Sequence, residues 1–378
     1  MDRIKQTLLN TSKPLFFPHD HKANHFKALD GLRGVAVLIV LLSHASNEGM
    51  WISPAMNFSG TGKIGVFLFF VLSAYLLDRQ IIDKLITNQA SIQYWKYYFA
   101  KRFLRIYPLY AIVLILYITL TLLGFATVID EPYDIPLHLL LLKGESIFWS
   151  IAVEFKYYFI SPIIVLFCAS LLKWDVRKCL TYLMGITLIC VVLQQVFSFS
   201  EISTIRFMPI FLVGTMISLV ERVGLGNWTF SVSRRKIELS GILSLLLIFL
   251  SMPFLFSTFS TAHFNVDASS MYFTYGLLWG LVLIAAKHGA GLIKFVLELK
   301  PLRFVGVISF SMYLLHKPVL RLARMDLVWT EDFRLCVFAI LTLIVSTVSY
   351  LVIERPLSMI KVAGNSGSGK EKLQKTVL

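Results

Sequence analysis

Charged residues are scarce in this sequence. Asp, Glu, Lys and Arg make up 15% of its 378 residues, whereas soluble domains contain about 25%. The polar segments between the apolar runs are short, and none of them is long enough to fold as a sizeable soluble domain. The composition therefore excludes a predominantly soluble protein.

Cysteine is also rare, which limits the kinds of site that the chain can form. The four cysteines lie in or beside apolar runs, with no C-x-x-C pair and no histidine close to them in sequence. Metal centres and disulfide frameworks normally show closer and more regular spacings. We therefore expect no metal ion and interpret the cysteines as ordinary buried thiols; they are Cys168, Cys179, Cys190 and Cys336.

The basic residues do not gather in one region, although the formal net charge is +14. Proteins that bind nucleic acid concentrate Lys and Arg in a patch or stripe, and here these residues alternate between connecting segments. We therefore expect no nucleic-acid partner. The first 27 residues also lack the apolar core of a cleavable signal peptide, so we expect the first apolar run to act as its own signal.

Hydrophobic residues are abundant: they form 57% of the chain, with 30 Phe and 15 Tyr, and the mean hydropathy is +0.72. Apolar runs of about 20 residues, the length that crosses a bilayer, recur along almost the whole chain. This pattern predicts an all-α polytopic membrane protein with about ten transmembrane helices in residues 28–356, between a tail at 1–27 and a disordered tail at 357–378. The predicted spans are 28–46, 63–80, 104–128, 147–171, 178–198, 204–221, 237–257, 270–287, 303–321 and 334–354.

The distribution of basic residues predicts how these spans are oriented. If both termini are cytoplasmic, 27 of the 36 Lys and Arg lie inside, 7 lie outside and 2 lie within spans. Connections rich in Lys and Arg are preferentially cytoplasmic. We therefore expect both termini in the cytoplasm.

Three ionisable residues fall within predicted spans at a similar depth. His44 lies on the first span, Glu154 on the fourth and His316 on the ninth, all towards the outer side of the bilayer in this topology. Ionisable groups inside a bilayer cost about 2.5–3.5 kcal/mol on insertion scales and usually mark a reaction site or a pathway. The convergence of these residues from three helices predicts an active site.

A purely structural role is the alternative for each of these residues. Histidines can satisfy backbone carbonyls between helices, and such polar contacts contribute on the order of 0.6 kcal/mol each. Glu154 and Lys156 could form an ion pair, but residues two apart point to opposing faces of a helix. That spacing disfavours the pair.

Three arginines are predicted near the cytoplasmic side. Arg33 precedes His44 by eleven residues, which places it on nearly the same helix face and roughly 16 Å away along the axis. Arg102 and Arg105 lie one turn apart on one face. They either anchor the span in the usual positive-inside manner or form a guanidinium clamp for phosphate. A phosphate-rich cytosolic ligand whose reactive end reaches into the membrane would connect the arginines with His44.

Six motifs, in order along the chain, resemble those of the membrane-bound acyltransferase family 3, which includes O-antigen and other cell-envelope O-acetyltransferases. The most specific is Leu-Asp-Gly-Leu-Arg-Gly, in which Arg33 is followed eleven residues later by His44. The resemblance extends from about Phe26 to Pro356. The other motifs are Gly65–Ser73, Arg102–Pro108, Trp149–Glu154, Ser311–His316 and Glu354–Pro356.

The resemblance implies an integral-membrane O-acyltransferase of the bacterial cytoplasmic (inner) membrane. Its donor would be cytosolic acyl-CoA, above all acetyl-CoA, and its acceptor a sugar hydroxyl of a cell-envelope polysaccharide or a lipid-linked glycan. Arg33, Arg102 and Arg105 would hold the phosphates of coenzyme A. No metal is required.

The resemblance also implies roles for the intramembrane residues. His44 would deprotonate the acceptor hydroxyl, because the pKa of imidazole lies close to working pH. Glu154 would orient His44, as the third group does in triad-like arrangements, and His316 is the remaining catalytic candidate. A transient acyl-histidine at His44 is an alternative that the sequence leaves open.

The chain departs from the family pattern at three positions. Phe67 replaces a common Asp, Ala74 a common Gly, and Lys156 a common Gln or other polar residue, so no acidic role is carried over to position 67. The SGNH hydrolase-like domain that some relatives carry is also not found in this sequence. We therefore expect the membrane unit to complete the transfer by itself or with a separate partner.

Two other functions remain open from the sequence. A transporter or flippase of an envelope glycan or acyl precursor would also place polar residues in the membrane, but the inverted repeats typical of transporters are not apparent. An inactive relative that acts as a scaffold for envelope synthesis is less consistent with the intact Arg33 and His44.

Overall fold

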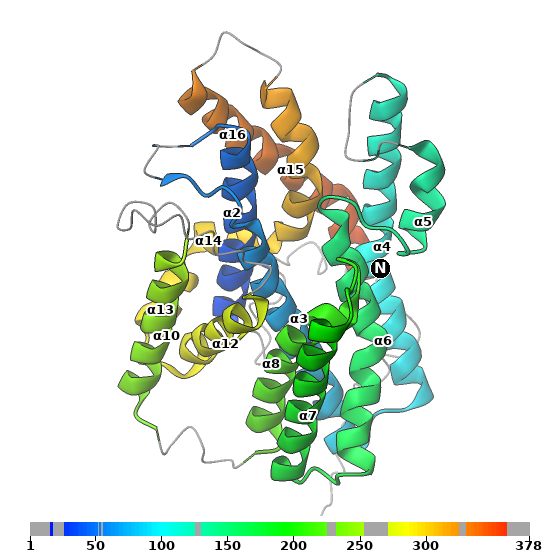
Figure 1. Ribbon diagram of the computed structural model, residues 1–378, viewed down its shortest axis with the longest axis vertical. Helices are drawn as coiled ribbons and strands as arrows, with labels where there is room; N and C mark the ends of the chain where they lie inside the picture. The colour runs from blue at the N-terminus through cyan, green and yellow to red at the C-terminus, as the bar shows by residue number, and fades with distance from the viewer. Residues whose placement is uncertain are drawn as a thin grey trace, which may run out of the picture.

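The structure is a computed structural model, and it describes residues 16–17, 26–51, 53, 56–124, 129, 131–224, 232–252, 271–324 and 330–360. Within these residues all regular secondary structure is helical, which confirms the predicted fold class. The longer helices are α2 (Lys27–Asn47), α3 (Gly62–Ile86), α4 (Ile92–Leu122), α6 (Phe148–Ser170), α7 (Val176–Val196), α8 (Thr204–Arg222), α10 (Arg234–Leu250), α12 (Tyr272–His288), α15 (Ser309–Arg324) and α16 (Glu331–Ser349) (Figure 1). The shorter elements are η2 (Pro132–Asp134), α5 (Ile135–Leu139), α13 (Leu292–Leu297), α14 (Lys300–Val307), the π-helical η3 (Tyr350–Glu354) and α17 (Arg355–Met359).

Seven helices in the described part of the chain are long and apolar enough to cross a membrane. The chain is therefore a multi-pass membrane protein. α10 and α12 have 17 residues each and α15 has 16, short of the usual span length. The predicted total of ten spans and the cytoplasmic location of the termini therefore stay predictions. The seven candidates are Lys27–Asn47, Gly62–Ile86, Ile92–Leu122, Phe148–Ser170, Val176–Val196, Thr204–Arg222 and Phe333–Met359.

Two predicted spans differ from the observed helices. α4 begins at Ile92 rather than at residue 104, because the Ser91 side chain caps its first turn by accepting from the Tyr94 N–H. The span predicted at 303–321 is divided at Ile308 into α14 and α15. Residues 125–128, 253–257 and 270 of other predicted spans, and most of both predicted tails, lie outside the described residues.

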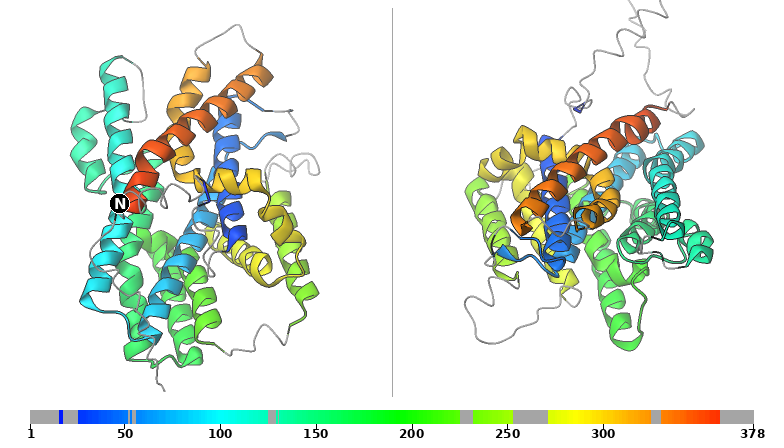
Figure 2. Two further views of the ribbon diagram at one scale, coloured as in Figure 1. Left: turned by 180° about the vertical axis from the view of Figure 1, so that it is seen from behind. Right: turned by 90° about the horizontal axis from the view of Figure 1, so that it is seen from above.

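Several of the longer helices run in alternating directions along the bundle (Figure 1). The C-terminal ends of α2, α4 and α15 lie at one end of the bundle, and the α3–α4 and α6–α7 connections lie at the opposite end (Figure 1). Figure 2 shows α16 crossing the bundle obliquely on the side where α15 lies. α2 and α15 lie side by side, and their facing side chains form part of the candidate site.

Small residues allow α2 to pack closely on α13 and α14. A Cβ atom added at Gly31 would lie 2.0 Å from the carbonyl oxygen of Leu297, and one at Gly34 would lie 2.3 Å from that of Leu302. On α14, a Cβ atom added at Gly306 would lie 1.7 Å from the backbone carbonyl oxygen of Asp30. The two glycines of the Leu-Asp-Gly-Leu-Arg-Gly motif are therefore required by backbone contact.

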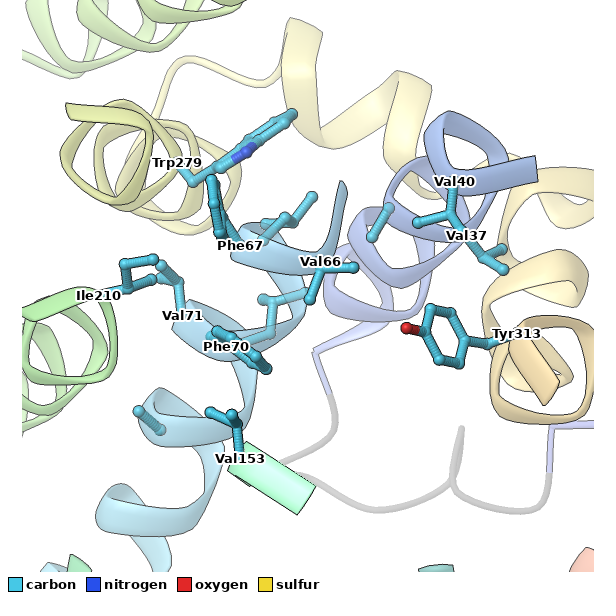
Figure 3. Close-up of a cluster of buried hydrophobic side chains, with 14 of the residues drawn as sticks. Val37, Val40, Val66, Phe67, Phe70, Val71, Val153, Ile210, Trp279 and Tyr313 are labelled. Carbon is cyan, nitrogen blue, oxygen red and sulfur yellow. The ribbon is translucent and has the colours of Figure 1, made fainter. Parts of the chain in front are cut away.

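α3 lies at the centre of the bundle. Its side chains Val66, Phe67, Phe70 and Val71 are buried and face α2 on one side and α8 and α12 on the other (Figure 3). Phe67, which replaces the common acidic residue, packs near aromatic rings of α8 and α12. Position 67 is therefore part of the apolar core.

A buried polar cluster joins α3 to α6 and α8. The Asp78 carboxylate accepts hydrogen bonds from the Tyr157 hydroxyl at 2.9 Å, the Thr215 hydroxyl at 2.5 Å and the Ser161 hydroxyl. Because a buried charge is tolerated only when it is fully hydrogen-bonded, this cluster fixes how the three helices are rotated relative to one another.

Candidate active site along three cavities

The structure brings His44 and His316 into direct contact. His316 Nε2 lies 2.8 Å from His44 Nδ1, and the two ring centroids are 4.9 Å apart with the ring planes inclined by 22°. His316 is fully buried, and its Nδ1 lies 2.7 Å from the carbonyl oxygen of Tyr313 and 3.2 Å from that of Met312. His316 therefore satisfies carbonyls, as the structural alternative suggested, and contacts His44 as well.

His44 is half-buried and lines a cavity of about 350 Å³, which we call the histidine cavity. Polar groups around it include Ser43, Asn47 and Lys63, and Lys63 forms a 2.8 Å ion pair with Glu201. A cavity with several hydrogen-bonding groups and a histidine in its wall can hold a polar ligand beside the imidazole.

Glu154 lines a second and much narrower cavity, which we call the central passage. Its volume is about 40 Å³, little more than the space that one water molecule takes up in the liquid. Glu154 Oε1 accepts hydrogen bonds from the Ser73 hydroxyl at 2.6 Å and the Tyr158 hydroxyl at 2.7 Å. Because two spans hold the carboxylate, its position in the passage is fixed.

The structure shows no hydrogen bond between the described side chains of Glu154 and His44, the contact through which the resemblance would have Glu154 orient His44. The Glu154 carboxylate accepts hydrogen bonds from Ser73 and Tyr158, and the His44 ring is hydrogen-bonded to His316. The two histidine rings contact each other, and Glu154 lies in the wall of the adjoining central passage. Lys156 donates to the Ile202 carbonyl at 3.2 Å, in agreement with the spacing argument against a Glu154–Lys156 ion pair.

A third cavity, which we call the arginine cavity, is lined by all three predicted arginines and has a volume of about 450 Å³. Arg102 donates to the Gln80 side chain at 2.8 Å and lies over the rings of Tyr98 and Tyr158. Among the described side chains, Arg33 and Arg105 form neither a hydrogen bond nor an ion pair. Two unpaired guanidinium groups in one cavity are a suitable site for an anion.

The three cavities follow one another through the bundle. The histidine cavity and the central passage share Val66 and Tyr313 in their walls. The central passage and the arginine cavity share Arg33 and Arg105. The arrangement can therefore hold an anionic group at one end and a polar acceptor at the other, with a narrow connection between them.

Sequence reasoning gave no role to two residues of this site. The Tyr313 hydroxyl lies 2.7 Å from Ser150 Oγ and donates to the Ile147 carbonyl, at the boundary between the histidine cavity and the central passage. Glu354 lies in the wall of the arginine cavity and is hydrogen-bonded to Ser311. Glu354 could have been found as an ionisable residue at the end of a predicted span.

Three comparisons with known proteins bear on this site. A family profile described as an acyltransferase domain matches residues 26–354, which include all six candidate residues. No solved structure matches the chain.

The curated relatives include O-acetyltransferases. The chain is 23% identical to the peptidoglycan O-acetyltransferase OatA of Listeria monocytogenes, over 89% of the chain and 56% of that protein. It is 22% identical to the O-acetyltransferase OatA of Staphylococcus aureus, over 89% of the chain and 58% of that protein. The chain thus spans less than three fifths of the length of these relatives. Since the family profile covers nearly the whole chain, the protein belongs to the acyltransferase 3 family.

Proposed function

We propose that the protein transfers an acyl group, acetyl in the first instance, from acyl-CoA to a hydroxyl group of a cell-envelope glycan, in the bacterial cytoplasmic membrane. The observation that carries this proposal is the succession of three cavities, with unpaired guanidinium groups at one end and a histidine pair at the other. The relatives named as O-acetyltransferases support acetyl as the group, and the peptidoglycan O-acetyltransferase among them makes peptidoglycan the first acceptor to test.

The donor would occupy the arginine cavity and the central passage. Arg33, Arg102 and Arg105 would bind the phosphates of coenzyme A, for which planar guanidinium groups provide paired N–H donors. The volume of the arginine cavity lies within the range of small-molecule sites. The pantetheine arm is thin and unbranched over most of its length. It is therefore the part of the donor that suits the narrow central passage.

The acceptor would occupy the histidine cavity, with one hydroxyl beside His44. His44 takes the proton from this hydroxyl, the oxygen bonds to the thioester carbonyl carbon, and the carbon–sulfur bond breaks. The coenzyme A thiolate then takes the proton from His44, so the ester and the free thiol are the products. General base catalysis of this kind typically contributes 10²–10⁴-fold to the rate.

Glu154 would act within the central passage rather than on His44. Its carboxylate is fixed by Ser73 and Tyr158, in the wall that the thioester end of the donor must pass. Glu154 and Arg33 line the same passage, so the carboxylate offsets part of the positive charge there. We assign it to keeping the donor and Arg33 in the arrangement needed for transfer.

The proposal is tested with the purified protein in lipid nanodiscs, supplied with radiolabelled acetyl-CoA and soluble peptidoglycan fragments. Label on the glycan is the expected result, and His44→Gln should abolish it. His138→Gln is the matched control, because His138 is buried in α5 and lines none of the three cavities. Transfer that persists in His44→Gln would overturn the assignment of the base. In liposomes, movement of labelled substrate across the bilayer without any transfer would favour a transporter.

A further inference from the structure

We propose that His316 is a positioning residue that holds the proton of neutral His44 on Nδ1 and so leaves Nε2 of His44 free to act as the base. This inference deepens the proposed function and rests on it for the role of His44. Hydrogen bonds link the Tyr313 carbonyl to His316 and His316 to His44. The inference follows from which atoms in this series can donate a hydrogen bond and which can only accept one.

His316 lies at the buried end of this series of hydrogen bonds. The carbonyl oxygens of Tyr313 and Met312 face Nδ1 of His316, at 2.7 and 3.2 Å. A carbonyl oxygen can only accept a hydrogen bond. Nδ1 of His316 must therefore carry a hydrogen, and in the neutral ring Nε2 is then an acceptor with a lone pair.

The position of the proton on His44 follows from the lone pair on His316. Its Nδ1 lies 2.8 Å from the lone pair on His316 Nε2. A hydrogen bond forms there only if Nδ1 of His44 is the donor, because two lone pairs would repel. The neutral His44 ring then has its own lone pair on Nε2. Since Nδ1 is engaged by His316, Nε2 is the nitrogen left for a ligand in the histidine cavity.

An acceptor for the Nδ1–H of His44 is needed because a free histidine side chain does not favour the tautomer with the proton on Nδ1. The histidine side chain in water prefers the opposite tautomer, with the proton on Nε2, and in that form the nitrogen available to a ligand is a donor. In the Ser-His-Asp proteases a buried carboxylate that accepts the Nδ1–H of the histidine has the same orienting effect. Its replacement by an amide, which favours the wrong tautomer of the histidine, lowers kcat by about 10⁴-fold. Here a second histidine, anchored on its own backbone, is the acceptor.

The inference is tested first with two substitutions of similar length, His316→Gln and His316→Met. The Gln amide oxygen can accept the Nδ1–H of His44, whereas the Met side chain offers only a weak acceptor. We expect His316→Gln to remain within about tenfold of the wild-type kcat and His316→Met to lose about 10²–10⁴-fold, with the KM for acetyl-CoA unchanged in both. Equal kcat values for the two variants, with both folded by thermal melting, would overturn the inference.

The second test reads the tautomer directly, by ¹⁵N NMR of histidine-labelled protein in nanodiscs. The His44 signals are assigned by comparison with His44→Gln. We expect a protonated Nδ1 and an unprotonated Nε2 in the wild type, and a shift towards protonated Nε2 in His316→Met. A wild-type His44 protonated on Nε2 would disprove the inference even if His44→Gln abolished transfer. Conversely, if the tautomer is as expected but His44→Gln still transfers acetyl groups, the proposed function fails and the tautomer assignment stands.

Discussion

His44 on α2 and His316 on α15 form a 2.8 Å contact between ring nitrogens, although 272 positions separate them in the chain. The contact depends on the packing between them, because α14 lies against α2 and continues into α15 after Ile308. A displacement of α14 would therefore separate the two rings.

The close approach of α14 to α2 predicts that Gly306→Ala is destabilising. The added Cβ would lie 1.7 Å from the backbone carbonyl oxygen of Asp30. Overpacking of this kind typically lowers the free energy of unfolding by about 1–3 kcal/mol. The measurement is thermal unfolding in nanodiscs, together with acetyl transfer. Gly185→Ala on α7 is the matched control, because no atom lies within 4 Å of the added Cβ, and it should be neutral or stabilising by up to about 1 kcal/mol. Equal melting temperatures for Gly306→Ala and wild type would contradict the packing argument.

The unpaired arginines predict a loss of donor affinity in Arg33→Gln and Arg105→Gln. Each variant removes a charged hydrogen-bond donor that contributes about 1.5–3 kcal/mol, so the Kd for acetyl-CoA should rise by about 10–100-fold. Arg102→Gln should also weaken binding. Isothermal titration or filter binding measures the effect. Arg177→Gln, on an exposed part of α7, should leave the Kd unchanged; unaltered values in the Arg33 and Arg105 variants would remove the phosphate site.

The narrow central passage predicts that a larger side chain in its wall blocks transfer without blocking binding of the nucleotide end of the donor in the arginine cavity. Ile151 is buried and lines the passage, and Ile151→Trp should lower kcat by about 10²-fold, since a misplacement of about 1 Å can cost that much. The Kd for 3′-phospho-ADP, the nucleotide part of coenzyme A without the pantetheine arm, should not change. Ile163→Trp is the control on the same helix, at a position 67% exposed. Normal turnover in Ile151→Trp would mean that the donor takes another route.

The hydrogen bonds to Glu154 predict a defect in turnover rather than in donor affinity. Glu154→Gln keeps the size of the side chain but removes its negative charge, so kcat should fall by about tenfold or more. The Kd for acetyl-CoA should be unchanged or lower, because the passage becomes more positive. Glu131→Gln, at an exposed position, is the control for surface charge. A raised Kd with normal kcat would place Glu154 in the donor-binding site instead.

Hydropathy was sufficient to locate most helices, and particular residues explain the exceptions. A helix that crosses a bilayer requires about 20 apolar residues in a row. Because this requirement concerns one continuous segment, it can be recognised from the sequence alone. The start of α4 at Ile92 was missed because its first turns are amphipathic, with Tyr94 and Tyr98 buried among polar neighbours. The break at Ile308 was missed because Val307 and Ile308 continue the apolar run and positions 307–309 contain neither proline nor glycine.

The sequence by itself determined that this is a helical membrane protein with arginines, a carboxylate and two histidines inside or beside its spans, because composition, span length and motif spacing are properties of the chain. Only the tertiary structure decided that His44 contacts His316 while Glu154 is held by Ser73 and Tyr158. The physical reason is that helix rotation and tilt are set by contacts between distant segments, such as the approach of Gly34 to Leu302, and depth along a span does not specify them.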